Sequence, residues 1–106
     1  TQPLPDIDAT VEARVDEEIA KEHFQQGNDF ARPADYENAI ASYTKALESN
    51  PDFADAYYNR GSAYLDLEQY DKALKDWDKA LKIDPYHSGA INNREILLKE
   101  HPELKP

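Results

Sequence analysis

Apolar and small residues recur at the spacing of an α-helix through the middle of the chain. Two segments, residues 54–67 and 70–83, each place these side chains on one face, and a polar break at Glu68 and Gln69 separates them. The first segment carries Tyr57, Gly61, Tyr64 and Leu65 on this face, and the second carries Tyr70, Ala73, Leu74, Trp77, Ala80 and Leu81. The pattern predicts a helix, a tight turn and a second helix.

The sequence also matches itself, without a gap, when it is shifted so that Gly27 falls on Gly61. Small residues align with small ones and aromatic residues with aromatic ones. We expect the glycines and alanines to lie where two helices approach closely, and the aromatic residues to be buried beside them. The aligned pairs are Gly27 and Gly61, Phe30 and Tyr64, Tyr36 and Tyr70, Ala39 and Ala73, Ile40 and Leu74, Tyr43 and Trp77, Ala46 and Ala80, Leu47 and Leu81, and Pro51 and Pro85.

Prolines and capping residues mark the ends of these helices. Pro51 and Pro85 disfavour the helical conformation of the residue before each of them, so they end the second helix of each repeat. Pro33 should shorten or kink the first helix and alter the turn that follows. Upstream, Thr10 is a plausible N-cap for a long first helix over residues 10–32, whose amphipathic pattern includes Val11, Val15, Ile19 and Phe24.

Downstream, Ser88 is a candidate cap for a fifth helix that carries Ile91, Leu97 and Leu98 and covers the apolar end of the array. The predicted fold is therefore all-α, with about five helices forming two full repeats and a C-terminal capping helix. We expect an N-terminal tail at residues 1–9, an extension of the first helix at 10–19, the first repeat at 20–53, the second at 54–87, the capping helix at 88–101 and a C-terminal tail at 102–106.

The charge of the chain argues against nucleic acid as a partner. The net charge is -10, and binding to phosphates requires clustered Lys and Arg. Half of the excess lies in residues 1–22, a run that is either a solvated helix face or a docking surface for a basic partner. This run contains the carboxylates Asp6, Asp8, Glu12, Asp16, Glu17, Glu18 and Glu22 and the cations Arg14 and Lys21.

The composition gives little information about the cellular compartment of the protein. No apolar run approaches the roughly 18 residues needed to cross a bilayer, so we expect no membrane insertion. The chain has no cysteine, which leaves the redox compartment open. It starts at Thr1 and has no methionine, which indicates a processed or excised form of a longer product. The localisation is therefore unknown: cytoplasmic is the default, and a processed exported form is the alternative.

No constellation of residues indicates catalysis. His23, His87 and His101 are scattered without the spacing of metal ligands, and the sequence has no Gly-rich phosphate loop. We therefore expect no enzyme activity, no catalytic residues, no cofactor and no bound metal.

Residues 54–87 resemble the tetratricopeptide repeat, because they carry Tyr57, Gly61, Tyr64, Ala73, Trp77, Ala80 and Pro85 at the spacing of that family. Residues 20–53 match less closely at their start, where His23 and Gln26 replace large apolar residues. In the third unit, Glu95 stands where the family has glycine. The resemblance implies a right-handed superhelix of antiparallel helix pairs, in which the first helix of each pair lines a concave groove that holds a peptide or a partner helix. It names no ligand.

The resemblance also implies which side chains face the groove. They are Lys21, Phe24, Gln25 and Asn28 from the first pair, Asp55, Tyr58, Asn59 and Ser62 from the second, and Gly89, Asn92, Asn93 and Ile96 from the fifth helix. Gln25, Asn59 and Asn93 recur at the repeat period, which favours a ladder of amides that grips the backbone of an extended peptide. Phe24 and Tyr58 are candidates for an aromatic shelf under an apolar anchor of the ligand, or for packing against the first helix.

Family members that bind the acidic C-terminus of chaperones share a clamp of two asparagines and three cationic side chains. Asn28 and Asn59 match the asparagines, but Phe24, Gly89 and Asn93 occupy the cationic positions. The predicted function is therefore that of a scaffold or adaptor for an extended, non-acidic peptide or a partner helix. The alternatives are a fragment of a longer array, or a self-assembly module that forms a weak homo-oligomer through an exposed Leu97-Leu98 edge or a tail at residues 1–8.

Overall fold

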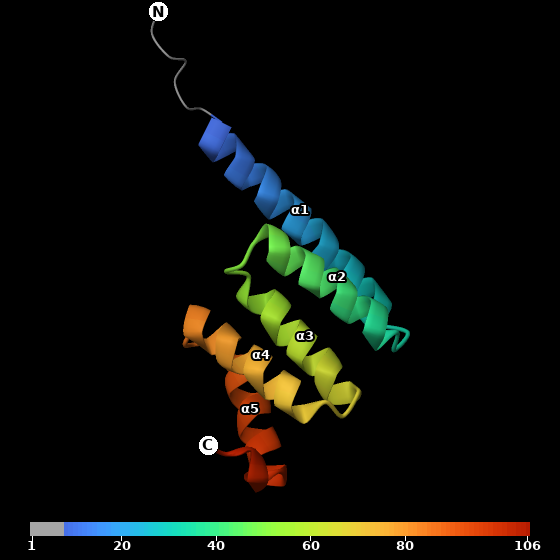
Figure 1. Ribbon diagram of the computed structural model, residues 1–106, viewed down its shortest axis with the longest axis vertical. Coiled ribbons are helices and arrows are strands. Elements are labelled where there is room, and N and C mark those ends of the chain that lie inside the picture. Colours follow the sequence, from blue (N-terminus) through green and yellow to red (C-terminus); the bar gives the residue numbers. More distant parts are fainter. Residues whose placement is uncertain (1–7) are drawn as a thin grey trace, which may run out of the picture.

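The computed structural model describes residues 8–106, and these form an all-α chain, as predicted. Each helix packs mainly on its neighbours in sequence, which produces an elongated stack (Figure 1). None of the described helices combines the length and the apolarity needed to cross a membrane. The elements are α1 (Asp8–Ala31), α2 (Tyr36–Ser49), α3 (Ala54–Asp66), α4 (Tyr70–Ile83), α5 (Ser88–Glu100) and the short 3-10 helix η1 (Pro102–Leu104).

The two hairpins, α1–α2 and α3–α4, bury the same aligned positions. Tyr43 and Trp77 are 2% and 0% exposed, and the four aligned alanines of α2 and α4 are fully buried, as the self-match predicts. Gly61 allows the indole of Trp77 to approach, because a Cβ at this position would lie 2.7 Å from its Nε1 atom. Phe30 departs from the prediction: it is 39% exposed, since α2 covers a different face of α1.

The turns inside the two hairpins have the same backbone geometry. Ala34 and Glu68, which occupy equivalent positions of the two repeats, both adopt positive φ angles, of 64° and 59°. The amide of the next residue donates across each turn, from Asp35 to the Phe30 carbonyl at 3.0 Å and from Gln69 to the Tyr64 carbonyl at 2.9 Å. Pro33 does shorten α1, which ends at Ala31, but the expected change in the turn is wrong, because the proline fits a position that both turns share.

Two of the predicted caps are also wrong. Helix α1 begins at Asp8, so Thr10 lies inside it, while residues 1–7 lie outside the described part of the chain. The cap of α5 is His87, not Ser88, because its Nδ1 atom accepts a hydrogen bond from the Ala90 amide at 3.1 Å.

The C-terminal end of the stack is closed by α5 and η1. Leu97 and Leu98 are 2% and 8% exposed, so the exposed edge considered for self-assembly does not exist. Residues 102–104 form η1, and Leu104 packs against the cluster that contains Trp77. The expected C-terminal tail is therefore wrong for these residues, because an apolar side chain anchors them.

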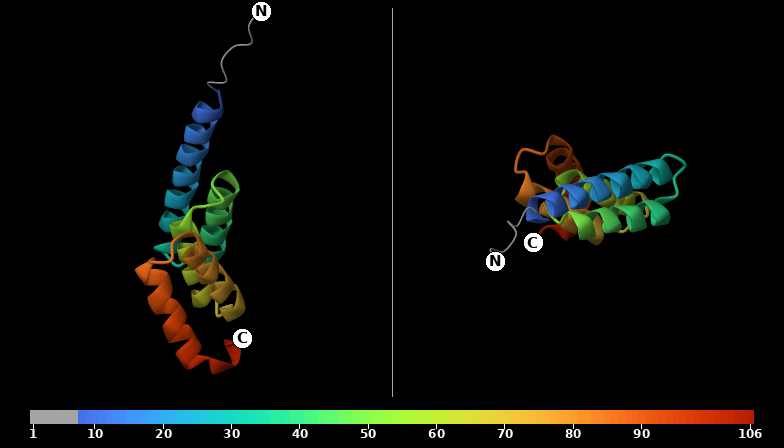
Figure 2. Two further views of the ribbon diagram at one scale, coloured as in Figure 1. Left: turned by 90° about the vertical axis from the view of Figure 1, so that its left-hand side faces the viewer. Right: turned by 90° about the horizontal axis from the view of Figure 1, so that it is seen from above.

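At the other end, the N-terminal half of α1 projects beyond α2 (Figures 1 and 2). Residues 11–19 are all exposed, including the apolar Val11, Val15 and Ile19.

Candidate functional site

A groove of about 520 Å³ lies between the C-terminal part of α1, the start of α2 and α3. It brings together three residues that the sequence analysis placed in the binding surface, namely Asn28, Asn59 and Ser62. The remaining lining residues are Ala31, Arg32, Tyr36, Tyr43, Ala63 and Asp66. The groove is thus a mixed polar and aromatic surface contributed by three helices.

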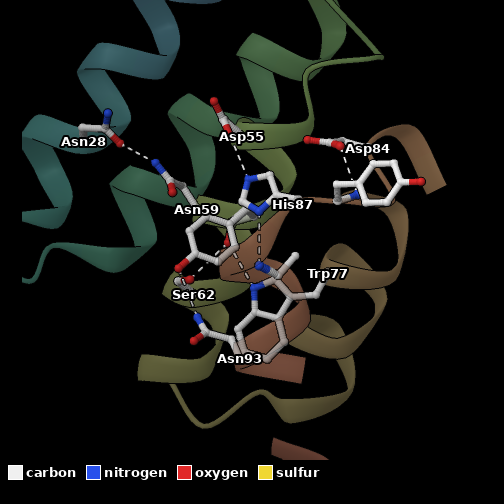
Figure 3. A network of polar contacts seen from close by, with 11 residues as sticks. Asn28, Asp55, Asn59, Ser62, Trp77, Asp84, His87 and Asn93 are labelled. Atoms are coloured by element: carbon white, nitrogen blue, oxygen red, sulfur yellow. Dashed lines mark hydrogen bonds and ion pairs between the residues drawn. The ribbon is translucent and has the colours of Figure 1, made fainter. Parts of the chain in front are cut away.

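Asn28 and Asn59, which both line this groove, are joined by a hydrogen bond between α1 and α3 (Figure 3). The Oδ1 atom of Asn28 accepts one hydrogen bond from the Tyr43 hydroxyl at 2.6 Å and another from Asn59 Nδ2 at 2.9 Å. Within residues 11–106, no buried side-chain nitrogen or oxygen lacks a partner. The amide donors of Asn28 and the Oδ1 acceptor of Asn59, which these bonds leave unused, are therefore at least partly exposed.

The groove carries both signs of charge. Arg32 lies 3.7 Å from Asp29 in an exposed ion pair, so its charge is partly compensated. The carboxylate of Asp66 raises the pKa of the Tyr36 phenol by its negative charge, and burial raises the pKa of Tyr43. Both tyrosines therefore remain neutral hydrogen-bond donors at neutral pH, and Tyr43 holds Asn28 in place.

A second group of predicted residues holds α5 against α3. The Tyr58 ring lies 4.7 Å from the His87 ring between centroids, and its hydroxyl accepts a hydrogen bond from Asn93 Nδ2 at 3.2 Å. Because His87 Nδ1 accepts from the Ala90 amide, its Nε2 atom carries the proton and donates to Asp55 at 2.8 Å.

Gly89 permits this packing of Tyr58. A Cβ atom at position 89 would lie 2.7 Å from Cζ of the Tyr58 ring. A larger side chain at this position therefore requires Tyr58 to move.

The three amides predicted as a ladder bond to three different partners. Gln25 is exposed and donates to Asp29 at 3.0 Å, Asn59 bonds to Asn28, and Asn93 bonds to Tyr58. The structure records no bond between Gln25, Asn59 and Asn93 themselves. The three amides occupy equivalent repeat positions, but each side chain bonds to a closer partner.

The other predicted residues lie outside the groove. Lys21 is exposed and lies 3.6 Å from Glu18. Asn92 and Ile96 line a separate hollow of about 490 Å³ on α5, with Lys99 and Lys105.

Phe24 does not form a shelf with Tyr58. Its ring packs between Tyr43, at 5.8 Å, and Phe53, at 4.8 Å between centroids, and it joins the core cluster of α2 and α3. Tyr58 is bound to α5, as described above. The prediction of an aromatic shelf is therefore wrong, because both rings pack against other residues of the domain.

Sequence reasoning missed Arg32, Tyr36 and Asp66 in the groove. The alignment of Tyr36 with Tyr70 predicts only a packing role for this side chain. Arg32 immediately follows α1 and Asp66 is the last residue of α3. The available signal was that they occupy the same position of the two repeats.

Comparisons with known proteins agree with this architecture. A family profile described as "TPR repeat" matches residues 21–67, and one described as "Tetratricopeptide repeat" matches residues 54–87. A search of curated proteins finds no significant match.

Solved structures supply further detail. The Arabidopsis OM64 TPR domain is 26% identical with a TM-score of 0.79, covering 83% of this chain and 73% of that one. The TPR2B domain of yeast Sti1, in a complex with pHsp70, is 27% identical with a TM-score of 0.75, covering 79% and 67%. The second TPR of Spaghetti (RPAP3), bound to the HSP90 peptide SRMEEVD, is 30% identical with a TM-score of 0.81, covering 88% and 86%. With this identity over most of both chains and matching repeat profiles, the chain belongs to the tetratricopeptide repeat family.

Proposed function

We propose that this domain is a binding scaffold, not an enzyme, and that it holds an extended, non-acidic peptide segment in the groove between α1, α2 and α3. The observation that carries the proposal is the Asn28–Asn59 pair, which is held across two helices and keeps accessible amide groups on the groove side. An extended peptide presents backbone N–H and C=O groups that need such donors and acceptors.

The asparagine side chains of the groove are already oriented in the absence of a ligand. Tyr43 is 2% exposed, and its hydroxyl orients Asn28, which in turn orients Asn59. Side chains that are already held lose little rotamer entropy when a ligand binds. Gln25 and Asn93 would extend the contact along the peptide, each after releasing its present bond to Asp29 or Tyr58.

The charges around the groove favour a ligand without clustered carboxylates. Asp66 lines the groove, and the positive charge of Arg32, which also lines it, is partly compensated by Asp29. The domains bound to chaperone peptides show that related grooves accept acidic segments, among them SRMEEVD. In this chain the positions of the clamp cations are Phe24, which is packed in the core, Gly89, which contacts Tyr58, and Asn93. Burying carboxylates there without cations is unfavourable.

Two peptides of the same length test the proposal. One is SRMEEVD with a free C-terminus, and the other is SQMQQVN with an acetylated N-terminus and an amidated C-terminus, which removes every charged group. We expect the neutral peptide to bind at least about tenfold more tightly in calorimetry, because its carboxamides need no cationic partner. NMR spectra should show shifts of the side-chain amides of Asn28 and Asn59.

Substitution distinguishes the groove from the rest of the surface. Asn28→Ala with Asn59→Ala should abolish binding of the neutral peptide, whereas Asn92→Ala, at an exposed position of α5 outside the groove, should leave its affinity unchanged. Tighter binding of SRMEEVD than of the neutral peptide would overturn the proposed preference for non-acidic segments. If the double variant bound the neutral peptide as tightly as the wild type does, the proposed site at Asn28 and Asn59 would be wrong. Sedimentation of the free protein tests the alternative of self-assembly. The Leu97-Leu98 edge cannot mediate it, because both side chains are buried.

A further inference from the structure

Helix α1 has a second apolar face that no part of the described structure covers. Val11, Val15 and Ile19 follow one another at intervals of four residues and are 52%, 49% and 37% exposed. At about 100° per residue, Val11, Val15 and Ile19 lie about 180°, 140° and 100° around the helix from Ala20. Ala20 is fully buried, and the apolar stripe therefore faces away from the packed side of α1.

The stripe lies on the part of α1 that projects beyond α2 (Figures 1 and 2). Phe30, which is 39% exposed, continues the same side of the helix, since it lies eleven residues, or about three turns, after Ile19. None of these residues lines the groove described above. The stripe is therefore a surface separate from the candidate peptide site.

Carboxylates surround the stripe. Residues 11–22 carry five of them against two cations, a net charge of -3, and all five are exposed. Glu18 and Glu22 follow Val15 and Ile19 at three residues, and so border the stripe directly. Lys21 lies 3.6 Å from Glu18, and no other carboxylate of this described stretch lies within ion-pair distance of a cation. The acidic run and the apolar stripe thus form one surface.

We propose that this face of α1, formed by Val11, Val15 and Ile19 with their flanking carboxylates, binds an amphipathic helix of a basic partner. Apolar residues at intervals of four along a straight helix match the i, i+3, i+4 anchors of a partner helix. The carboxylates pair with Lys and Arg that flank those anchors. A second copy of the chain is disfavoured, because contact between two copies of this face would bring two charges of -3 together.

A synthetic helical peptide tests the inference on the intact domain. The probe has about three heptads, with leucine at a and d and lysine at e and g, and the control peptide has glutamate in place of lysine. We expect the lysine peptide to bind, to shift the backbone NMR signals of residues 11–22, and to weaken at least about tenfold when salt is raised to about 0.5 M. The glutamate peptide should not bind.

A triple variant, Val11→Gln, Val15→Gln and Ile19→Gln, removes the stripe and retains helix propensity. It should lose at least about tenfold in affinity for the lysine peptide. Because these side chains are exposed, its melting temperature should stay close to that of the wild type. Asn28→Ala with Asn59→Ala should leave this binding unchanged, so failure of this inference and failure of the groove proposal are distinguishable.

Three results would overturn the inference. The first is no binding of the lysine peptide, and the second is binding whose NMR shifts map to the groove. The third is a concentration-dependent dimer of the free domain that the triple variant abolishes, which would assign the face to a second copy.

Discussion

Arg60 on α3 and Asp76 on α4 form a largely buried ion pair that fixes one hairpin and joins it to α2. Arg60 donates from Nε and Nη2 to the two oxygens of Asp76, both at 2.7 Å, and from Nη1 to Thr44 on α2 at 3.2 Å. The two side chains are 19% and 7% exposed. These hydrogen bonds to Asp76 raise the pKa of Arg60 above its usual value, so the guanidinium stays charged.

Asp76→Ala removes both charge-assisted bonds and leaves the guanidinium without its anion. Bonds to charged groups contribute about 1.5–3 kcal/mol each, and breaking a buried pair costs about 3–5 kcal/mol. Arg60 keeps some contact with water and remains 5.5 Å from the Tyr57 ring, so we expect the lower end, about 3 kcal/mol. For a domain of this size, that loss corresponds to a fall of roughly 12 °C in the melting temperature.

Asp78 provides a matched control on the same helix. It pairs with Arg94 at 2.5 Å, but the two side chains are 51% and 34% exposed, so Asp78→Ala should cost less than about 1 kcal/mol. The assay is urea unfolding followed by the fluorescence of Trp77, for both variants. Equal destabilisation by Asp76→Ala and Asp78→Ala would refute the reasoning.

A double-mutant cycle isolates the interaction. With Arg60→Met as the second single variant, we expect a coupling energy of about 2 kcal/mol, and the double variant should be less destabilised than the sum of the two singles. A coupling energy below about 0.5 kcal/mol would show that the pair does not hold the hairpin, and that burial of the surrounding rings does.

Three further predictions concern single positions. Gly61→Ala should lower the stability in urea unfolding by about 1–3 kcal/mol, because the new Cβ would meet the Trp77 indole; an unchanged midpoint would contradict the close approach. Glu68→Gly should raise the melting temperature, since φ is 59° and a left-handed conformation costs about 1–2 kcal/mol for residues with a Cβ; a lower melting temperature would contradict this. Asp66→Asn should lower the pKa of Tyr36, followed by NMR of its ring carbon, because the negative charge that disfavours the phenolate is removed; an unchanged pKa would place the cause elsewhere.

The groove shows how far the sequence leads toward a site. The resemblance to the repeat family predicts that Asn28, Asn59 and Ser62 face one surface, and the three residues line the same groove. The hydrogen bonds of the predicted amide ladder could not be foreseen. Gln25, Asn59 and Asn93 bond to Asp29, Asn28 and Tyr58 instead of to one another. Distances of a few ångströms between side chains decide such bonds, and a repeat period does not specify them.

The sequence by itself determined the number of helices, their order and the small and large positions that pack inside each hairpin. These features depend on local spacing and on contacts between neighbours in sequence, so the repeat period contains them. Only the tertiary structure decided which face of a helix is covered. Helix α1 carries apolar residues on two faces: Phe24 is partly buried against α2 and α3, while Val11, Val15 and Ile19 remain exposed, because no described helix lies beside them. Apolar periodicity identifies a face, but the position of a neighbouring helix determines whether that face is core or binding surface.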